Sequence, residues 1–286
     1  LTRALYPMAA SIHAHVGRDM TVFVGQAHRD HAERFYAIFR DVLLSPAMSE
    51  ADFERVRDQQ REALRVDLRS SDDEALGEAA LHALTYGGHP YAHPPLGTER
   101  GLSRVRLDDV RAHRRRVFCA GRAIVGIAGD YPEALEASLV RDVSGLDGES
   151  CLGRRTLPAV EPLEAPRVLI VRKPDAPAVA VSMGFPIEVR REHPDYPALV
   201  LVASWLGQHR QFIGRLMQAI RGQRGLNYGD YAYAESFTQD GWSTFPLPNV
   251  ARRQQHFSIW LRPLRPETAH FAIRLAIREL RGLVER

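Results

Sequence analysis

The sequence has little cysteine, no long apolar run and no large excess of one charge. Its two cysteines, Cys119 and Cys151, allow one disulfide or none, so they do not decide the compartment. No apolar run approaches the roughly 18 residues of a membrane-spanning helix, and we expect a soluble chain without a membrane span. The formal net charge is +3. So slight an excess argues only weakly for an acidic partner and does not predict nucleic-acid binding.

An initiator methionine is also absent, and the residues after Leu1 do not form a signal peptide. At the other end, a helical pattern continues up to Arg286. We therefore expect both ends to be truncated and the chain to be a piece of a longer protein. The 286 residues predict about two domains, each large enough for its own core. For the localisation we expect a bacterial cytoplasm or periplasm.

Residue patterns predict both strands and helices in the first half of the chain. Residues 9–16 and 20–24 alternate on either side of a turn, as the two strands of a hairpin do. Helical periodicity and helix-start signals then predict helices, and an apolar run predicts a buried strand. The expected helices are 32–44, 53–69, 74–84 and 107–117, and the expected strand is 123–128.

The second half repeats this mixture after a segment, 144–165, that has few large apolar residues and several glycines and prolines. Such a composition is typical of an interdomain linker. The expected strands are 168–171, 178–185 and 257–261, and the expected helices are 198–206 and one that starts at Pro266. Because strands and helices occur in both halves, we predict an α+β fold in layers.

One stretch, 215–231, contains residues that could contact a substrate. Helix-forming residues are followed by Gly222 and Gly225, which end the helix, and the tyrosines that follow alternate as in a strand. Arg221 then lies at a helix end and Tyr228 at the entry to the next strand, so both can reach one substrate carbonyl. The alternative is a basic helix end that leads into a sheet without any chemical role.

Several short motifs, in their order along the chain, resemble one family. They are Tyr6-Pro7, Phe53-Glu54-Arg55, Leu81-His82-Ala83, His89-Pro90, Gly97 and Ala128-Gly129-Asp130, and then Lys173-Pro174, Ala176-Pro177, Arg215-Leu216, Ile220-Arg221, Arg224-Gly225-Leu226 and Tyr228. The chain is similar to the pitrilysin, insulinase and mitochondrial processing peptidase family of inverted zinc metallopeptidases, whose zinc motif is His-x-x-Glu-His. The resemblance implies two similar α/β-layered units of a clam-shell, both incomplete. The first unit would be 1–143 and the second 166–286.

The resemblance also implies residue roles. Arg221 and Tyr228 occupy the positions of the family's Arg and Tyr that hold the substrate carbonyl and the developing oxyanion, and they are the expected catalytic residues. The strand around His13, Ala14 and His15 matches the family's edge strand, which binds an extended peptide through its backbone. The implied partner is an unstructured peptide, with another peptidase-family subunit or a second copy as a further partner.

The zinc site is the weak point of this assignment. No His-x-x-Glu-His occurs in the sequence, and the family places that motif upstream of where this chain begins. The family's third ligand, a Glu, aligns with Ala63 or Arg65, so the neighbouring Glu62 is the candidate metal ligand. Zn²⁺ is expected in an active full-length protein, and this chain alone is not expected to be active. The alternative is a non-catalytic homologue that acts as a peptide-binding or assembly subunit.

Other histidines suggest a metal less strongly. His13, His15, His28 and His31 are close in sequence, and imidazole is a common zinc ligand, but their spacing matches no tetrahedral pattern. His89 belongs to a turn-forming segment and is expected to be structural.

Overall fold

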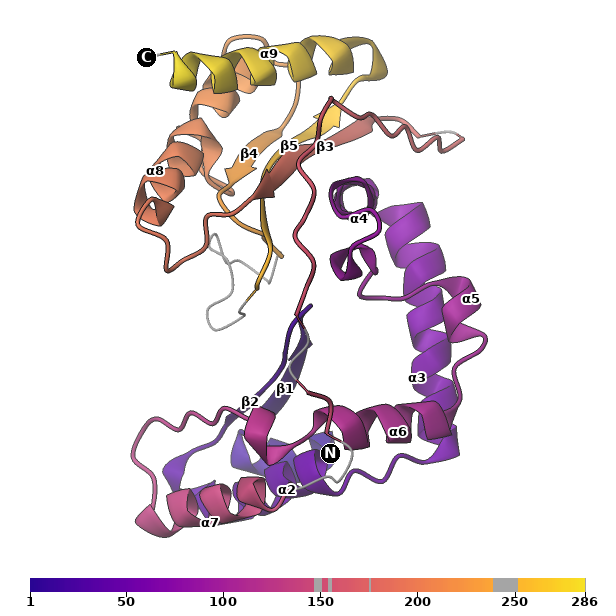
Figure 1. Cartoon of the computed structure of the whole chain (residues 1–286), viewed down its shortest axis with the longest axis vertical. Coiled ribbons are helices and arrows are strands. Elements are labelled where there is room, and N and C mark those ends of the chain that lie inside the picture. Colours follow the sequence, from indigo (N-terminus) through magenta and orange to yellow (C-terminus); the bar gives the residue numbers. More distant parts are fainter. Residues whose placement is uncertain (147–150, 154–155, 175, 239–251, 286) are drawn as a thin grey trace. The chain divides into compact units, whose positions relative to one another are not determined.

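The computed structural model describes residues 1–146, 151–153, 156–174, 176–238 and 252–285 (Figure 1). The chain forms two compact units. The first consists of Leu1–Arg61 and Gly97–Leu157, and the second of Glu62–Leu96 and Pro158–Arg286. The second unit thus includes a segment from the first half of the sequence. The predicted ranges 1–143 and 166–286 refer to family domains and stay a prediction, and parts of the predicted linker, 147–150 and 154–155, lie outside the described residues.

A two-stranded antiparallel sheet and four longer helices form the first unit. Strands β1 and β2 pair with Ala14 opposite Phe23, which confirms the predicted hairpin. The side chains of Phe35 and Phe39 approach β2 so closely that a Cβ on Gly25 would lie 2.6 Å from Phe35 Cζ. The elements are α1 (Thr2–Leu5), η1 (Tyr6–Met8), β1 (Ser11–Val16), β2 (Thr21–Gln26), η2 (Arg29–His31), α2 (Ala32–Leu44), α3 (Glu50–Glu62), α5 (Glu99–Leu102), α6 (Leu107–Val117), η5 (Ala120–Arg122) and α7 (Glu133–Ser144).

Polar contacts and one disulfide connect these helices. The Tyr36 hydroxyl of α2 donates to Asp142 of α7 over 2.9 Å. The guanidinium of Arg114 donates to the carbonyl oxygens of residues 43 and 44, which are otherwise unsatisfied at the end of α2. Cys119 and Cys151 form a disulfide. Of the two alternatives that the sequence leaves open, the structure therefore has the one with a disulfide.

Three antiparallel strands in the order β3-β5-β4 form the sheet of the second unit. Helices cover both of its faces, so β4 is buried along its whole length and β5 along most of its own. The elements are η3 (Ala63–Ser71), α4 (Asp73–Thr85), η4 (Pro90–Ala92), β3 (Val179–Ile187), α8 (Tyr196–Gly207), η6 (Met217–Gly222), β4 (Gly229–Tyr233), β5 (Gln255–Leu264) and α9 (Pro266–Val284).

The alternation of β5 explains the two layers of helices. Phe257, Ile259 and Leu261 share one face and belong to a core cluster with residues of α8, η6 and α9. His256 and Arg262 share the opposite face, where they contact His82 and Glu74 of α4. Figure 1 shows α4 on one side of this sheet and α9 on the other. The α+β fold with helix-covered antiparallel sheets is thereby confirmed.

Two predicted strands are wrong, whereas the residues predicted as a helix at 53–69 are helical. The apolar runs 123–128 and 168–171 pair with no strand in the described part of the chain, and Ile124 is 92% and Ile170 78% exposed. An apolar run becomes a strand only where a partner edge satisfies its backbone groups. The helix predicted at 53–69 consists of α3 followed by the π-helix η3.

Candidate functional site

The turn from η6 to β4 has Arg221 at a helix end and Tyr228 at the entry to a strand, the two positions that the sequence predicts. Arg221 lies in η6, a π-helical turn, and Tyr228 immediately precedes β4. Between them, Gly225 has a φ of +60°, which glycine adopts without the steric cost of a Cβ. Its N–H donates to the Arg221 carbonyl over 2.7 Å. Short π-helical turns are rare and occur frequently at functional sites.

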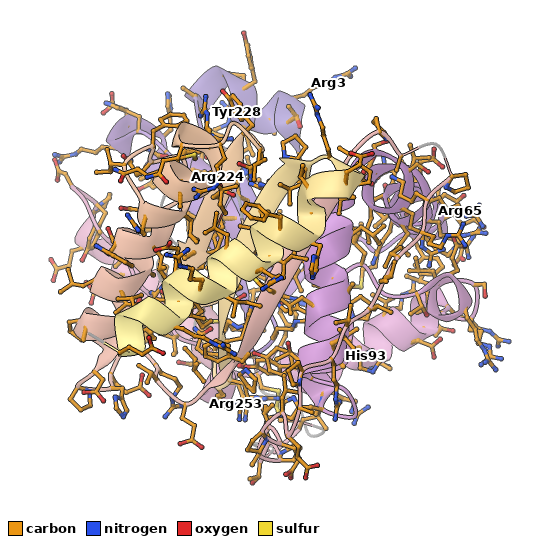
Figure 2. The ribbon with its side chains drawn as sticks, turned by 90° about the horizontal axis from the view of Figure 1, so that it is seen from above. Arg3, Arg65, His93, Arg224, Tyr228 and Arg253 are labelled. Carbon is orange, nitrogen blue, oxygen red and sulfur yellow. A yellow bond between two sulfur atoms is a disulfide. The ribbon has the colours of Figure 1, made fainter. Side chains whose placement is uncertain are left out.

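The side chains of Arg221 and Tyr228 pack directly against each other. The guanidinium lies 4.6 Å from the centroid of the Tyr228 ring and 5.1 Å from that of Phe212. It also donates to the Tyr228 carbonyl over 3.4 Å. Tyr228, labelled in Figure 2, is 63% exposed, and Phe212 is 56% exposed. The two rings thus hold a cation at the surface by cation–π contacts.

We call this cluster of Arg221, Phe212 and Tyr228 the Arg221 stack. It contains hydrogen-bond donors that a ligand could use. A guanidinium carries five N–H donors, and one of those of Arg221 is used by the Tyr228 carbonyl in the described structure. The exposed tyrosine hydroxyl is a further donor. Fixed donors that surround one point can hold a carbonyl oxygen or an oxyanion.

A buried carboxyl lies directly behind the Arg221 stack. Asp230 is the second residue of β4 and has no solvent exposure. The side-chain amide of Asn227 donates to Asp230 Oδ1 and to the Gly229 carbonyl. Asp230 Oδ2 has no hydrogen-bond partner among the described residues. Burial raises the pKa of Asp230 to about 7, although Asn227 and Arg221 both act to lower it. The carboxyl therefore remains largely protonated below neutral pH.

This raised pKa predicts that Asp230→Asn stabilises the chain in a pH-dependent way. An unperturbed aspartate has a pKa of 3.8, so between about pH 4 and 7 the folded chain keeps a proton that the unfolded chain has released. The free energy of unfolding of the wild type therefore loses this contribution as the pH rises, by up to about 1.4 kcal/mol per pH unit. In urea titrations, the advantage of the variant should grow to about 2–4 kcal/mol at pH 7 and then stay constant.

The quantity to measure is the difference in the free energy of unfolding between variant and wild type. The reason is that His209 changes this free energy with pH in the opposite direction to Asp230. Burial lowers the pKa of His209 to about 4, with Arg262 and Arg210 as further causes, and its Nδ1 lies 2.7 Å from the Tyr233 hydroxyl oxygen. Its contribution to stability is lost as the pH falls from 6.5 towards 4. Both proteins share this effect, so it cancels. A difference that does not change with pH would contradict the buried, protonated Asp230.

The predicted substrate-binding residues lie in a different unit from the Arg221 stack, which belongs to the second unit. His13, Ala14 and His15 lie in β1 of the first unit, opposite Val24, Phe23 and Val22. Within the described residues β1 pairs with β2 alone, so its second edge has unpaired backbone groups, as strand addition requires. Their role in substrate binding stays a prediction.

The described residues do not fit a zinc ion. Glu62 is exposed at the end of α3, and no group of three His, Cys, Asp or Glu side chains in the described ranges could hold a metal. Zinc sites use three or four such ligands. His89 is structural, as expected: its Nδ1 accepts from the Tyr91 N–H and caps η4.

Phe212, Asn227 and Asp230 are site residues that the sequence analysis missed. An Asp between Gly229 and Tyr231, in a strand that is otherwise apolar or aromatic, was the available signal, because a charged residue at a buried position needs a specific reason. Phe212 gave no signal, since its distance from Arg221 depends on how the preceding loop folds.

Comparisons with known proteins agree with this architecture of two α+β units whose antiparallel sheets are packed by helices. The family model described as "Insulinase (Peptidase family M16)" matches residues 1–99, and the one described as "Peptidase M16 inactive domain" matches residues 104–248. The chain belongs to the peptidase M16 family, which includes insulinase and pitrilysin. The resemblance deduced from the sequence is confirmed.

Similar proteins carry different functional names. An "Uncharacterized zinc protease YmxG" of Bacillus subtilis is 23% identical over 253 residues, which are 88% of this chain and 59% of that protein. A "Non-peptidase homolog YmxG" of Helicobacter pylori is 24% identical over 203 residues, 71% of this chain and 45% of that protein. The chain thus spans about half the length of these relatives.

Solved structures of low sequence identity share the fold. A peptidase M16 inactive domain from Pseudomonas fluorescens aligns with a TM-score of 0.80 and 20% identity, over 100% of this chain and 64% of that chain. Pitrilysin aligns with a TM-score of 0.60 and 15% identity, over 98% of this chain and 29% of that chain. At such identities the likeness concerns the fold alone.

Proposed function

We propose that this chain is the peptide-binding part of a zinc metallopeptidase-like protein and that Arg221 and Tyr228 hold a carbonyl oxygen of the peptide. The observation that carries the proposal is the Arg221 stack: a guanidinium 4.6 Å from an exposed tyrosine ring, with N–H donors left for a ligand. In a hydrolytic form of the protein, the same donors would stabilise the negative charge that develops on that oxygen. The substrate class is an unstructured polypeptide, because a folded protein would not expose an extended backbone.

Binding of a fluorescein-labelled unstructured peptide tests the proposal on the chain itself. Arg221→Ala removes the guanidinium and should weaken binding about tenfold, the usual loss for a charge-assisted hydrogen bond to a ligand. Arg34→Ala is the matched control, because Arg34 is exposed on α2 of the first unit, and it should leave the affinity unchanged. Fluorescence anisotropy gives both dissociation constants. Equal affinities for wild type and Arg221→Ala would remove Arg221 from the peptide site.

A non-catalytic subunit that binds peptides or a partner subunit is the second candidate function. The observations in its favour are that the family's third zinc ligand, a Glu, aligns with Ala63 or Arg65 here, and that one relative is named a non-peptidase homologue. Zinc content and peptide cleavage, measured on the product of the complete coding sequence, separate the two candidates. A stoichiometric zinc ion with cleavage supports the peptidase, and peptide binding without either supports the subunit.

Of the two predicted compartments, cytoplasm and periplasm, we propose the periplasm. The Cys119–Cys151 disulfide supports this choice, because disulfides persist mainly in oxidising compartments. No helix in the described ranges is long and apolar enough to cross a membrane. Trapping of free thiols in intact cells tests the proposal: both cysteines should resist alkylation until a reductant is added.

A further inference from the structure

The outer face of α9 carries a row of arginines that the proposed function does not use. Arg274, Arg278 and Arg281 follow one another at intervals of four and three residues, which places them on one face of the helix. All three are exposed. In the part of the chain that the structure describes, no carboxylate forms an ion pair with them, so their charges are available to a ligand.

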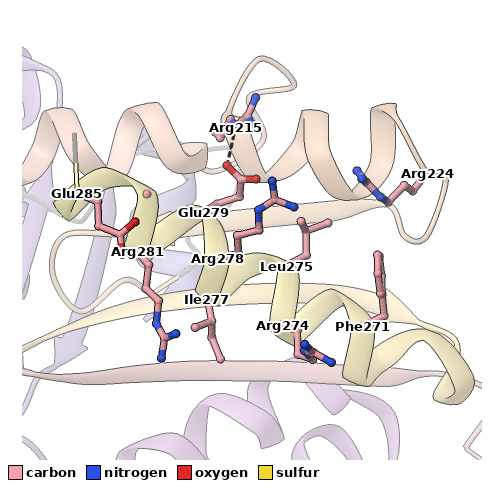
Figure 3. A pocket seen from close by; sticks show the side chains of 11 residues that line it. Arg215, Arg224, Phe271, Arg274, Leu275, Ile277, Arg278, Glu279, Arg281 and Glu285 are labelled. Carbon is pink, nitrogen blue, oxygen red and sulfur yellow. Dashed lines mark hydrogen bonds and ion pairs between the residues drawn. The ribbon is translucent and has the colours of Figure 1, made fainter.

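This row borders a groove of about 920 Å³ (Figure 3). Arg215 and Arg224 line it from the segment that contains η6, and Figure 3 shows Arg278 on the same side of α9 as these two residues. Arg215 Nε donates to Glu279 Oε2 over 2.7 Å, and the Arg224 guanidinium donates to the carbonyl of residue 219 over 2.7 Å. These two arginines are thus fixed by the protein, while the row on α9 can adapt to what binds.

The groove also offers apolar surface. Phe271 is 50% and Ile277 38% exposed, and both line the groove beside Leu275. The Arg224 guanidinium lies 5.9 Å from the Phe271 ring centroid. The complete lining contains five arginines and two glutamates, Glu279 and Glu285, which gives a net charge of +3.

This combination selects an acidic peptide over a nucleic acid. Guanidinium groups bind carboxylates in a bidentate way, and the exposed apolar side chains can pack against aliphatic or aromatic residues between the acids. A phosphate backbone carries no side chains that could pack against the exposed Phe271 and Ile277, whereas a peptide does. Three arginines on one helix face match an extended segment that carries several acidic residues.

We propose that the groove lined by Arg274, Arg278 and Arg281 binds an acidic, extended segment of another polypeptide. The site is separate from the Arg221 stack and does not depend on the proposed function. Because its charges are exposed, binding should weaken as the salt concentration rises.

A charge-matched pair of variants tests the proposal. The probe is a fluorescein-labelled octaglutamate, and its dissociation constant is measured by anisotropy at low salt. The groove variant is Arg274→Gln/Arg278→Gln/Arg281→Gln, and the control is Arg34→Gln/Arg115→Gln/Arg116→Gln, which changes the net charge equally through exposed residues of the first unit. All six side chains are exposed, so both variants should fold, and circular dichroism verifies this.

The groove variant should bind octaglutamate at least about tenfold more weakly than the wild type, and the control variant less than threefold more weakly. An equal loss in both variants would mean that net charge alone attracts the peptide and would overturn the proposal. Tighter binding of a labelled octathymidylate than of octaglutamate, again lost in the groove variant, would replace the peptide by a nucleic acid. Absence of saturable octaglutamate binding to the wild type would likewise overturn the proposal.

Discussion

In a form of the protein that hydrolyses peptides, Tyr228→Phe is expected to lower the turnover number by about one to three orders of magnitude. The substitution keeps the ring, so the cation–π contact with Arg221, 4.6 Å from the ring centroid, remains. It removes only the hydroxyl donor, which would act on the oxygen where negative charge develops. The apparent affinity for the substrate should therefore change much less than turnover.

Steady-state kinetics on one peptide, with kcat and KM determined separately, checks this expectation. Tyr6→Phe is the control, because Tyr6 is 83% exposed in the first unit, and it should leave both constants unchanged. An unchanged kcat in a folded Tyr228→Phe variant would exclude the hydroxyl from the chemistry. A raised KM with an unchanged kcat would assign Tyr228 to binding alone.

The second large effect is expected from Gly184→Ala in β3. Gly184 lies opposite Ser258 of β5, and a Cβ at position 184 would lie 2.2 Å from the backbone oxygen of Phe257. Because backbone atoms cannot move aside as a flexible side chain can, the two strands must separate. We expect the second unit to lose about 3–5 kcal/mol of its free energy of unfolding.

Tryptophan fluorescence in a urea titration reports this change, since the described tryptophans, Trp205 and Trp260, belong to the second unit. Gly282→Ala in α9 is the matched control, because apart from the adjacent residues and backbone of its own helix no described atom lies within 4 Å of the added Cβ. It should be neutral or stabilising by about 0.5–1 kcal/mol, as alanine favours a helix over glycine. Equal midpoints for the two variants would contradict the close pairing of β3 and β5.

Much of this fold could be predicted from local patterns. The periodicity of residues 32–44 gives α2 with its bounds, and the alternation of residues 257–261 gives the centre of β5. Patterns failed where the outcome depends on distant partners. The run that contains Ile124 has the composition of a strand, yet no partner strand in the described residues satisfies its backbone.

The candidate site shows the same division between local and distant information. Seven residues across a helix end that contains glycines were enough to predict that Arg221 and Tyr228 lie together. The burial of Asp230 could not be predicted in this way, because residues of α8 and β5 remove it from water. The packing of Phe212 against Arg221 likewise depends on a loop conformation that no local pattern specifies.

The most direct test of the central claim is to observe Tyr228 while a peptide binds. Selective ¹³C labelling of the tyrosine rings gives one set of signals for each of the nine tyrosines, and the Tyr228→Phe variant identifies the signal of Tyr228. On titration with an unstructured peptide, we expect the Tyr228 signal to shift and saturate, while the signal of Tyr6 stays in place. Saturable peptide binding that leaves the Tyr228 signal unmoved would contradict the account.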